Sequence, residues 1–149
     1  MAVYGVTEDE LADFLRIEDE REHAHLTDVL GSAKEAVDSF CGWDFDTDTA
    51  ATRVFAAKWG DLIYVDPLTA ITTLSVDTSA DGTFNETWAA ADYQREPLND
   101  PTSYRIRAIE SKRFPVSARA QVQIVGDFGW STIPTSVKTA VKLHAGRVP

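Results

Sequence analysis

The spacing of apolar residues changes twice along the chain, and this pattern constrains the fold more than any other feature. In residues 26–40, apolar side chains recur every three or four positions, which is the period of one helix face. Residues 52–130 instead contain short segments rich in Val, Ile, Thr and aromatic residues, separated by Gly, Pro, Asp and Asn, as is typical of strands. A helical pattern returns after Pro134. Helices and strands segregated in this order indicate an α+β fold.

The first third predicts a helical pair over residues 1–43. Thr7 and Glu10 have the spacing of a capping box, so a first helix should begin there, and a second should run from Asp19 to a stop at Gly42. On the first helix one apolar face holds Leu11, Phe14 and Leu15. On the second we expect the stripe Leu26, Val29, Leu30, Ala33, Val37 and Phe40 to pack against partner helices, with Cys41 as a small buried residue.

The middle predicts a central antiparallel β portion, residues 52–130, of about five or six short strands. The acidic segment 44–52 predicts a loop, and Asp81-Gly82 marks a hairpin turn. The strand segments are residues 53–57, 62–66, 71–77, 86–90, 104–109 and 120–128. A C-terminal helix over 134–146 should pack back on the helical pair, with His144 packed at its apolar edge or capping its carbonyls. We expect 1–149 to form a single domain.

The excess negative charge lies in the first third of the chain. Residues 1–50 hold 14 Asp/Glu and 3 Lys/Arg, whereas residues 51–149 hold 10 and 11, for a net charge of −10. Such an acidic surface repels a phosphate backbone, which argues against sequence-specific DNA binding there, and it also suits a simple solvated helical face. No apolar run approaches the roughly 20 residues that cross a bilayer, and the N-terminus does not resemble a signal peptide. We therefore expect a soluble, intracellular product with no membrane partner.

The motifs that carry chemistry lack their usual context. Asp127-Phe128-Gly129 matches the magnesium-binding triplet of kinases, but no phosphate loop or catalytic loop accompanies it, so we interpret it as a strand-to-helix turn with Phe128 facing the core. Asp44, Asp46 and Asp48 alternate as calcium ligands do, yet Gly and Glu are missing from the sixth and twelfth positions of that loop. We predict no catalytic residue, no cofactor and no metal site.

Four tryptophans remain as candidate contact residues. Trp43, Trp59, Trp88 and Trp130 each lie near the end of a predicted element, where such side chains serve either as interface anchors or as corners of the core. Both interpretations stay open from the sequence.

The order of elements and several local motifs resemble the head–tail connector family of tailed bacteriophages, also called adaptor or head-completion proteins. The resemblance covers nearly the whole chain, and the order of its motifs carries it more than any one of them. Its N-terminal part consists of Val6-Thr7, Leu11, Leu15-Arg16-Ile17, Glu18-Asp19, Ala33, Ala36, Phe40 and Gly42. Its later part consists of residues 62–68, 71–76, Asp92-Tyr93, 122–129, Ile133-Pro134, Lys138 and Ala140.

The resemblance implies a structural virion protein without enzymatic activity. It implies a homo-oligomeric ring, dodecameric in the family, located in the virion neck between capsid and tail and assembled in the host cytoplasm. The ring would extend the DNA channel under the portal protein and contact a tail-completion or stopper protein, while double-stranded DNA passes without sequence-specific binding. In that setting Glu18, Asp19, Glu20 and Glu22 form a possible DNA-repelling channel face, and the four tryptophans form possible subunit or partner contacts.

Two other functions remain open from the sequence. A tail-completion or other virion assembly protein would share the acidic, enzyme-free character. A small metal-dependent hydrolase or nuclease would need carboxylates that converge around a metal ion.

Overall fold

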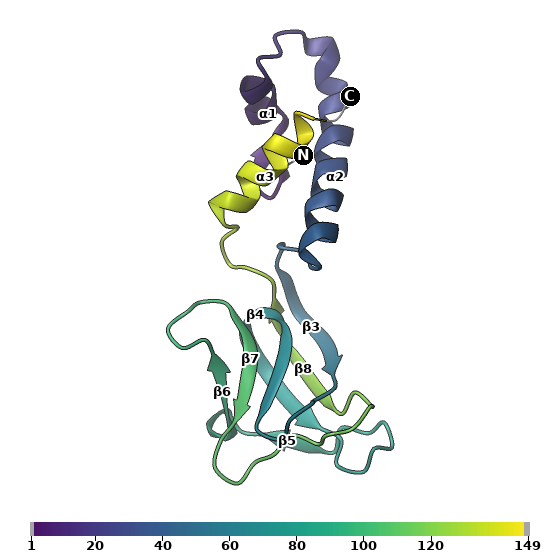
Figure 1. Ribbon diagram of the computed structural model, residues 1–149, viewed down its shortest axis with the longest axis vertical. Helices are drawn as coiled ribbons and strands as arrows, with labels where there is room; N and C mark the ends of the chain where they lie inside the picture. Colours follow the sequence, from purple (N-terminus) through teal and green to yellow (C-terminus); the bar gives the residue numbers. More distant parts are fainter. Residues whose placement is uncertain (1, 148–149) are drawn as a thin grey trace. The chain divides into compact units, whose positions relative to one another are not determined.

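The computed structural model describes residues 2–147, apart from the side chains of Glu20 and His23 (Figure 1). The chain forms two compact units: residues 1–46 together with 132–149, here the helical unit, and residues 47–131, here the β unit. Three α-helices and a six-stranded antiparallel sheet confirm the α+β class, with the helical pair, the central sheet and the C-terminal helix in the predicted order. That the whole chain acts as one domain stays a prediction.

The helical unit begins with a short hairpin and contains all three α-helices. Its elements are β1 (Ala2–Val3), β2 (Val6–Thr7), α1 (Glu8–Leu15), α2 (Glu20–Cys41) and α3 (Thr135–Ala145). The capping box is confirmed, because the Glu10 backbone N–H donates to the Thr7 hydroxyl and the Thr7 backbone N–H donates to the Glu10 carboxylate. Asp19 caps α2, and Gly42 ends it with a left-handed backbone at φ 81°.

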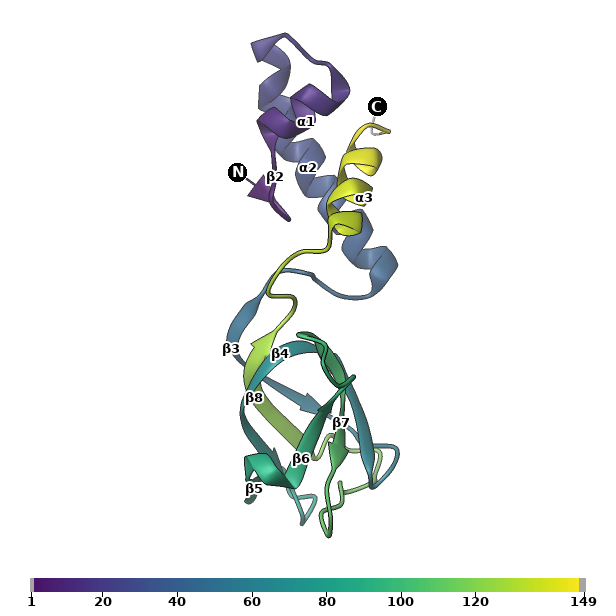
Figure 2. The same ribbon diagram turned by 90° about the vertical axis from the view of Figure 1, so that its left-hand side faces the viewer.

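Both α1 and α3 pack on α2, so the predicted return of the C-terminal helix is confirmed (Figure 2). The buried contacts come from Leu11 and Ala12 of α1, Leu26, Leu30 and Ala33 of α2, and Val137, Val141 and Ala145 of α3. Pro134 immediately precedes α3 and Gly146 follows it. No helix in the described part of the chain is long and apolar enough to cross a membrane.

The apolar stripe of α2 is only partly covered. Phe40 is 92% exposed, so its predicted packing against other helices is wrong, and Val37 and Cys41 are half-buried rather than buried. On α1 the side chain of Phe14 is 46% exposed although it shares a face with Leu11. Helical periodicity predicts which face of a helix a side chain lies on, but the side chain is buried only where another element packs against that face. Phe40 is exposed because it lies at the edge of the α2–α3 contact.

The β unit is a single antiparallel sheet with neighbours in the order β3–β8–β4–β7–β6, and β5 pairs with the end of β4 (Figure 1). Its strands are β3 (Asp48–Phe55), β4 (Leu62–Val76), β5 (Glu86–Trp88), β6 (Tyr93–Glu96), β7 (Ser103–Ala108) and β8 (Val122–Phe128). A short 3₁₀ turn, η1 (Ala90–Asp92), precedes β6. Six strands agree with the predicted number, but two predicted strands are joined, β3 begins earlier than predicted, and β6 was not predicted.

Two predicted strands, 62–66 and 71–77, form the one long strand β4. Its first part pairs with β7 and its second part with β8, and the register shifts between Tyr64 and Leu68. Pro67 lies in that interval, where a missing N–H removes no ladder bond. Its carbonyl accepts the Gly129 N–H at 2.7 Å. The predicted loop 44–52 is also wrong in its second half, since β3 already pairs with β8 from Asp48.

A contiguous apolar core fills the β unit. Its buried members include Ile63, Leu68, Leu74, Trp88, Ile106, Phe114, Ile124 and Phe128. Phe128 is fully buried at the end of β8, and Gly129 follows at φ 96°, which confirms that Phe128 ends a strand facing the core and that the chain turns at Gly129. Asp127 accepts the Ala50 backbone N–H at 2.9 Å and so fastens β3 to this turn.

The sheet requires a glycine where β4 and β8 come closest. A Cβ atom built on Gly126 would lie 2.1 Å from the Ala70 carbonyl oxygen, far inside van der Waals contact. The register between β4 and β8 shifts on both sides of this point. The chain enters the β unit next to where it leaves, because the Thr47 hydroxyl donates to the Trp130 carbonyl at 2.7 Å.

Candidate subunit interface

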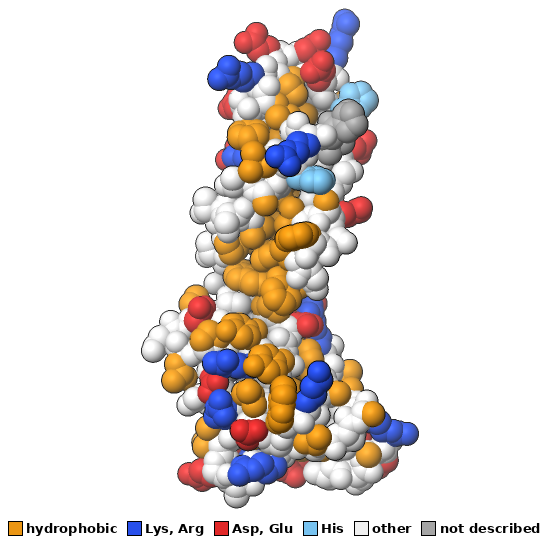
Figure 3. Space-filling view, in the orientation of Figure 1, with side chains coloured by type: hydrophobic (Ala, Val, Ile, Leu, Met, Phe, Trp, Pro, Cys, Tyr) orange, Lys and Arg blue, Asp and Glu red, His pale blue; other side chains and the backbone are white. Residues whose placement is uncertain are grey.

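An apolar groove of about 530 Å³ lies between α2 and α3 on the helical unit. In the space-filling view, hydrophobic side chains gather over this part of the unit (Figure 3). The groove is lined by Ala36, Val37, Phe40 and Cys41 from α2, and by Ser136, Val137, Ala140, Leu143, His144 and Arg147 from α3 and the residues after it. Hereafter this surface is the α2–α3 groove.

Large apolar side chains are exposed at both walls of the groove. Phe40 of α2 is 92% exposed and Leu143 of α3 is 51% exposed. A Phe side chain this exposed leaves apolar surface in contact with water, which burial would remove at roughly 25 cal/mol per Å². Contiguous surfaces of this kind mark interaction sites in soluble proteins.

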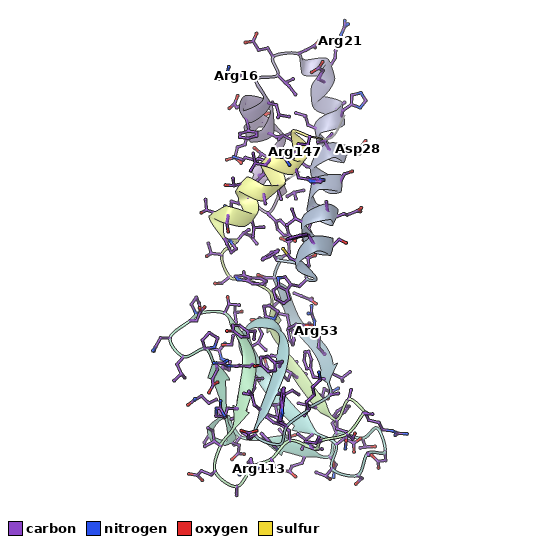
Figure 4. All side chains as sticks on the ribbon, in the orientation of Figure 1. Arg16, Arg21, Asp28, Arg53, Arg113 and Arg147 are labelled. Atoms are coloured by element: carbon purple, nitrogen blue, oxygen red, sulfur yellow. The ribbon has the colours of Figure 1, made fainter. Side chains whose placement is uncertain are left out.

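The charges on the helical unit are segregated by element. Residues 132–147, which include α3, contain Lys138, Lys142 and Arg147 and no Asp or Glu. Residues 8–22, which include α1 and the start of α2, contain eight Asp/Glu and two Arg. Figure 4 places Arg147 at the C-terminal end of α3. One helix of the unit is therefore basic and another is acidic.

The predicted channel face lies in that acidic segment. Glu18, Asp19 and Glu22 are exposed, and the Asp19 carboxylate also caps α2 by accepting the Arg21 backbone N–H at 2.9 Å. The side chain of Glu20 lies outside the described residues. That these residues face DNA stays a prediction.

A polar cluster ties the N-terminus to the chain that leaves α2. The Tyr4 hydroxyl donates to the Asp38 carboxylate, and it accepts the Phe45 backbone N–H at 2.9 Å. Lys34 Nζ lies 2.6 Å from Asp38 Oδ2 and 2.8 Å from Asp44 Oδ2. We call these residues, Tyr4, Lys34, Asp38, Asp44 and Phe45, the N-terminal clamp.

The clamp is a structural device, as its electrostatics indicate. Burial and the Asp38 carboxylate raise the pKa of Tyr4, which keeps the hydroxyl protonated as a donor. Burial works against charge on Lys34, but Asp38 and Asp44 raise its pKa overall. Burial likewise opposes ionisation of Asp44, while Lys34 and the Asp46 backbone N–H lower its pKa overall. The charged Lys34 is thus held between the carboxylates of Asp38 and Asp44.

The four tryptophans occupy different environments. Trp43 and Trp59 are exposed and Trp130 is half-buried. Trp88 is only 4% exposed and stacks on Phe114 with ring centroids 4.8 Å apart, so it belongs to the core of the β unit and is no longer a candidate contact residue. The sequence left open whether each tryptophan is an interface anchor or part of the core. For Trp88, which lies on β5 where this strand pairs with β4, burial shows that it is part of the core.

The β unit carries one nearly buried carboxylate on its outer strands. Glu96 of β6 accepts from Arg107 Nε at 2.7 Å and from Arg105 Nε at 2.9 Å, both on β7. The Arg107 guanidinium lowers the pKa of Glu96. These cross-strand pairs stabilise the β6–β7 edge.

The carboxylates that could suggest calcium are otherwise engaged. Asp44 contacts Lys34, and Asp48 lies 3.1 Å from Arg53. Among the described residues, no group of three or more His, Cys, Asp or Glu side chains is arranged to hold a metal ion.

Sequence reasoning missed Leu143 and Arg147 as surface residues, although the lack of acidic residues after 131 was a signal for a basic helix.

Comparisons with solved structures identify similar folds. A chain from the neck of an empty gene transfer agent (GTA) particle, computed with C6 symmetry, is 24% identical, with a TM-score of 0.59 over 94% of this chain and 75% of that one. A chain from the virion of the native GTA particle is 24% identical, with a TM-score of 0.60 over 99% and 80% of the two chains.

A third similar chain comes from the neck of the native GTA particle computed with C12 symmetry. It is 23% identical, with a TM-score of 0.53 over 99% of this chain and 79% of that one. No family model matches the sequence, and no curated protein does. At this level of identity the similarity shows the fold: this chain shares its α+β architecture with chains of GTA particles.

Proposed function

We propose that this protein is a structural component of a phage-like virion neck, where it forms a homo-oligomeric ring under the portal and connects the capsid to the tail. The observation that carries the proposal is the shared fold with chains of GTA necks, which extends over almost the whole chain. Those necks were computed with C6 and C12 symmetry, and both symmetries are compatible with a ring of twelve subunits, the number that the family resemblance implies.

The surface of the helical unit supports a ring. Cyclic rings need two different, complementary patches on each subunit, because the contact is head-to-tail. The α2–α3 groove is apolar and lies beside a basic helix, whereas α1 lies in an acidic segment. Exposed Trp43 and Trp59 are further candidates for contacts with a subunit or partner.

The remaining roles follow from the position of such a ring. The portal protein would contact it on one side and a tail-completion or stopper protein on the other. Double-stranded DNA would pass through it without sequence-specific binding, since an acidic surface that includes Glu18, Asp19, Glu20 and Glu22 repels phosphates. The protein would have no enzymatic activity and would be located in the virion after assembly in the host cytoplasm.

The test is to locate the protein in assembled particles. We expect electron microscopy of portal-containing particles, with the protein tagged or identified by its density, to show a ring of twelve copies directly below the portal. A position outside the neck, or a single copy per particle, would overturn the proposal. A position at the tail side of the neck, away from the portal, would instead indicate a tail-completion protein.

The mass of the isolated protein in solution is a weaker test. A ring interface that forms on the portal can be too weak to hold subunits together without it, so a monomer in solution is compatible with the proposal.

A further inference from the structure

We propose that the α2–α3 groove of one subunit receives α1 of the neighbouring copy, with Phe14 inserted between Phe40 and Leu143. This inference rests on the proposed ring and names the surfaces that form it.

The symmetry of a ring limits what can face the groove. Copies related by rotation about one axis place all their helical units at the same height and radius, so these units form one layer. In that layer the helical unit of the next copy is the neighbour that can fill the groove. Within one unit the C-terminal ends of α1 and α3 lie close together, since Leu15 Cδ2 would lie 3.0 Å from a Cβ atom on Gly146. A head-to-tail contact then requires that α1 and the groove engage different neighbours.

The apolar side chain that fits this role is Phe14. In the described part of the helical unit, the large hydrophobic side chains that are exposed are Phe14, Phe40, Trp43 and Leu143. Phe40 and Leu143 line the groove, and Trp43 follows Phe40 by three residues, at the same end of α2. Phe14 is the one on α1. A half-exposed Phe entering an apolar groove is a common form of interface anchor.

The charges around the two surfaces are complementary. The lining of the groove includes His144 and Arg147 and no carboxylate. On α1, Phe14 is preceded by exposed Asp13 and, one helical turn earlier, by exposed Glu10. When Phe14 enters the groove, we expect Asp13 of one copy to pair with Arg147 of the next. Opposite charges at the rim of an apolar contact fix its orientation and exclude a contact between two like surfaces.

The native Cys41 permits a direct test, because this thiol lines the groove and is the only cysteine of the chain. In the Phe14→Cys variant, assembled into portal-containing particles, a short bis-maleimide should link the introduced thiol to Cys41 of the next copy and give a ladder of covalent multimers. The Phe14→Cys, Cys41→Ser double variant should give none. Leu98→Cys, which places an exposed thiol on the β unit, is the matched control and should also give none.

A charge exchange tests the orientation of the contact. Asp13→Arg or Arg147→Asp alone should lower the occupancy of the protein in the neck about tenfold, and the double variant should restore it. Both residues are exposed, so the variants should melt as the wild type does, which circular dichroism checks.

The outcomes separate this inference from the proposed function. A ring seen by microscopy in the neck, without a link between the introduced thiol and Cys41 and without rescue by the double charge variant, would overturn the contact and leave the proposed function intact. A link from Cys41 to the portal protein would also overturn the contact, since it would show a different occupant. Absence of the protein from the neck would overturn both.

Discussion

The helical unit and the β unit are stabilised in different ways. The β unit has one contiguous buried core under an antiparallel sheet, and its charge is nearly balanced at 11 Asp/Glu and 8 Lys/Arg over residues 47–131. The helical unit has 13 Asp/Glu and 6 Lys/Arg, packs two helices on α2, and needs the N-terminal clamp to fasten its first residues. It also leaves the α2–α3 groove open to solvent.

This difference shows where stability and recognition lie in the chain. The β unit also exposes large apolar side chains, such as Trp59 and Tyr64, but in the helical unit exposed Phe40 and Leu143 line one apolar groove and offer it to another protein. Substitutions in the buried core of the β unit should therefore act mainly on folding, and those at the α2–α3 groove mainly on assembly.

The largest effect should come from Gly126→Ala. The new Cβ would meet the Ala70 carbonyl oxygen at 2.1 Å, and because that atom belongs to the backbone of β4, the strand itself must move. We expect the β unit to lose about 3 kcal/mol or more of its free energy of unfolding, measured by hydrogen exchange of β4 and β8 amides.

Gly31→Ala is the matched control for that variant. Nothing lies within 4 Å of a Cβ at Gly31, in the middle of α2. This change should stabilise the helical unit by about 0.5–1 kcal/mol, since Ala favours a helix over Gly. Equal behaviour of the two variants would contradict the close approach of β4 and β8.

A second, smaller effect is expected for the N-terminal clamp. Tyr4→Phe keeps the ring but removes the hydroxyl that bonds to Asp38 and to the Phe45 N–H. The helical unit should lose about 1–3 kcal/mol of its free energy of unfolding, because bonds to charged groups are lost and a buried N–H is left unpaired. Amide exchange in α2 and α3 should accelerate while β8 is unchanged. The exposed Tyr104→Phe should have no such effect, and if it did, the loss could not be assigned to the clamp.

The third prediction concerns acid stability of the β unit. The folded state lowers the pKa of Glu96, so this carboxylate contributes stability above its ordinary pKa of 4.5, and the contribution is lost as the pH falls below that value. Glu96→Gln should lower stability at pH 7 by about 1–2 kcal/mol and make stability less dependent on pH between 6 and about 3. Urea unfolding at several pH values measures this slope. An unchanged slope would show that Glu96 is not the group responsible, and exposed Glu110→Gln serves as the control.

The smallest effect on folding should come from Phe40→Ala. Because Phe40 is 92% exposed, truncation should change the free energy of unfolding by less than about 0.5 kcal/mol, in contrast to buried Leu30→Ala at about 2–5 kcal/mol. The same Phe40 variant should nevertheless reduce incorporation into the neck. If thermal or urea unfolding showed a loss of more than about 2 kcal/mol in the free energy of unfolding, Phe40 would have to be part of the core, which would contradict the division between the units.

Local patterns predicted the helices well, because their signals lie close together in the sequence. The Thr7–Glu10 box, the Asp19 cap and the Gly42 stop each depend on a few neighbouring residues, and all three are present in the structure. The end of β8 at Phe128, followed by a turn at Gly129, was also predictable, since polar and apolar residues alternate along this strand up to Phe128.

Features that depend on distant partners were not predictable. The union of two predicted strands into β4 depends on a change of partner from β7 to β8 around Pro67, and β6 was missed because its four residues gain their strand character from β7. The exposure of Phe14 and Phe40 was not predictable for the same reason. A sequence pattern predicts the face of a helix on which a residue lies, but not whether another element covers that face. The candidate interface depends on the exposure of Phe40 and Leu143 together with the basic charge of α3, and helical periodicity predicts neither.

The hydrogen bond between Thr47 and Trp130 has a consequence for synthesis of the protein. It marks the two ends of the β unit as neighbours, so this unit is an insertion within the helical one and can fold on the ribosome from a continuous stretch of chain. The helical unit cannot be completed until α3 has followed the β unit out of the ribosome. The α3 wall of the α2–α3 groove is therefore absent from every nascent chain that ends before residue 136, so under the proposed function a subunit cannot join the ring until it has been translated past its β unit.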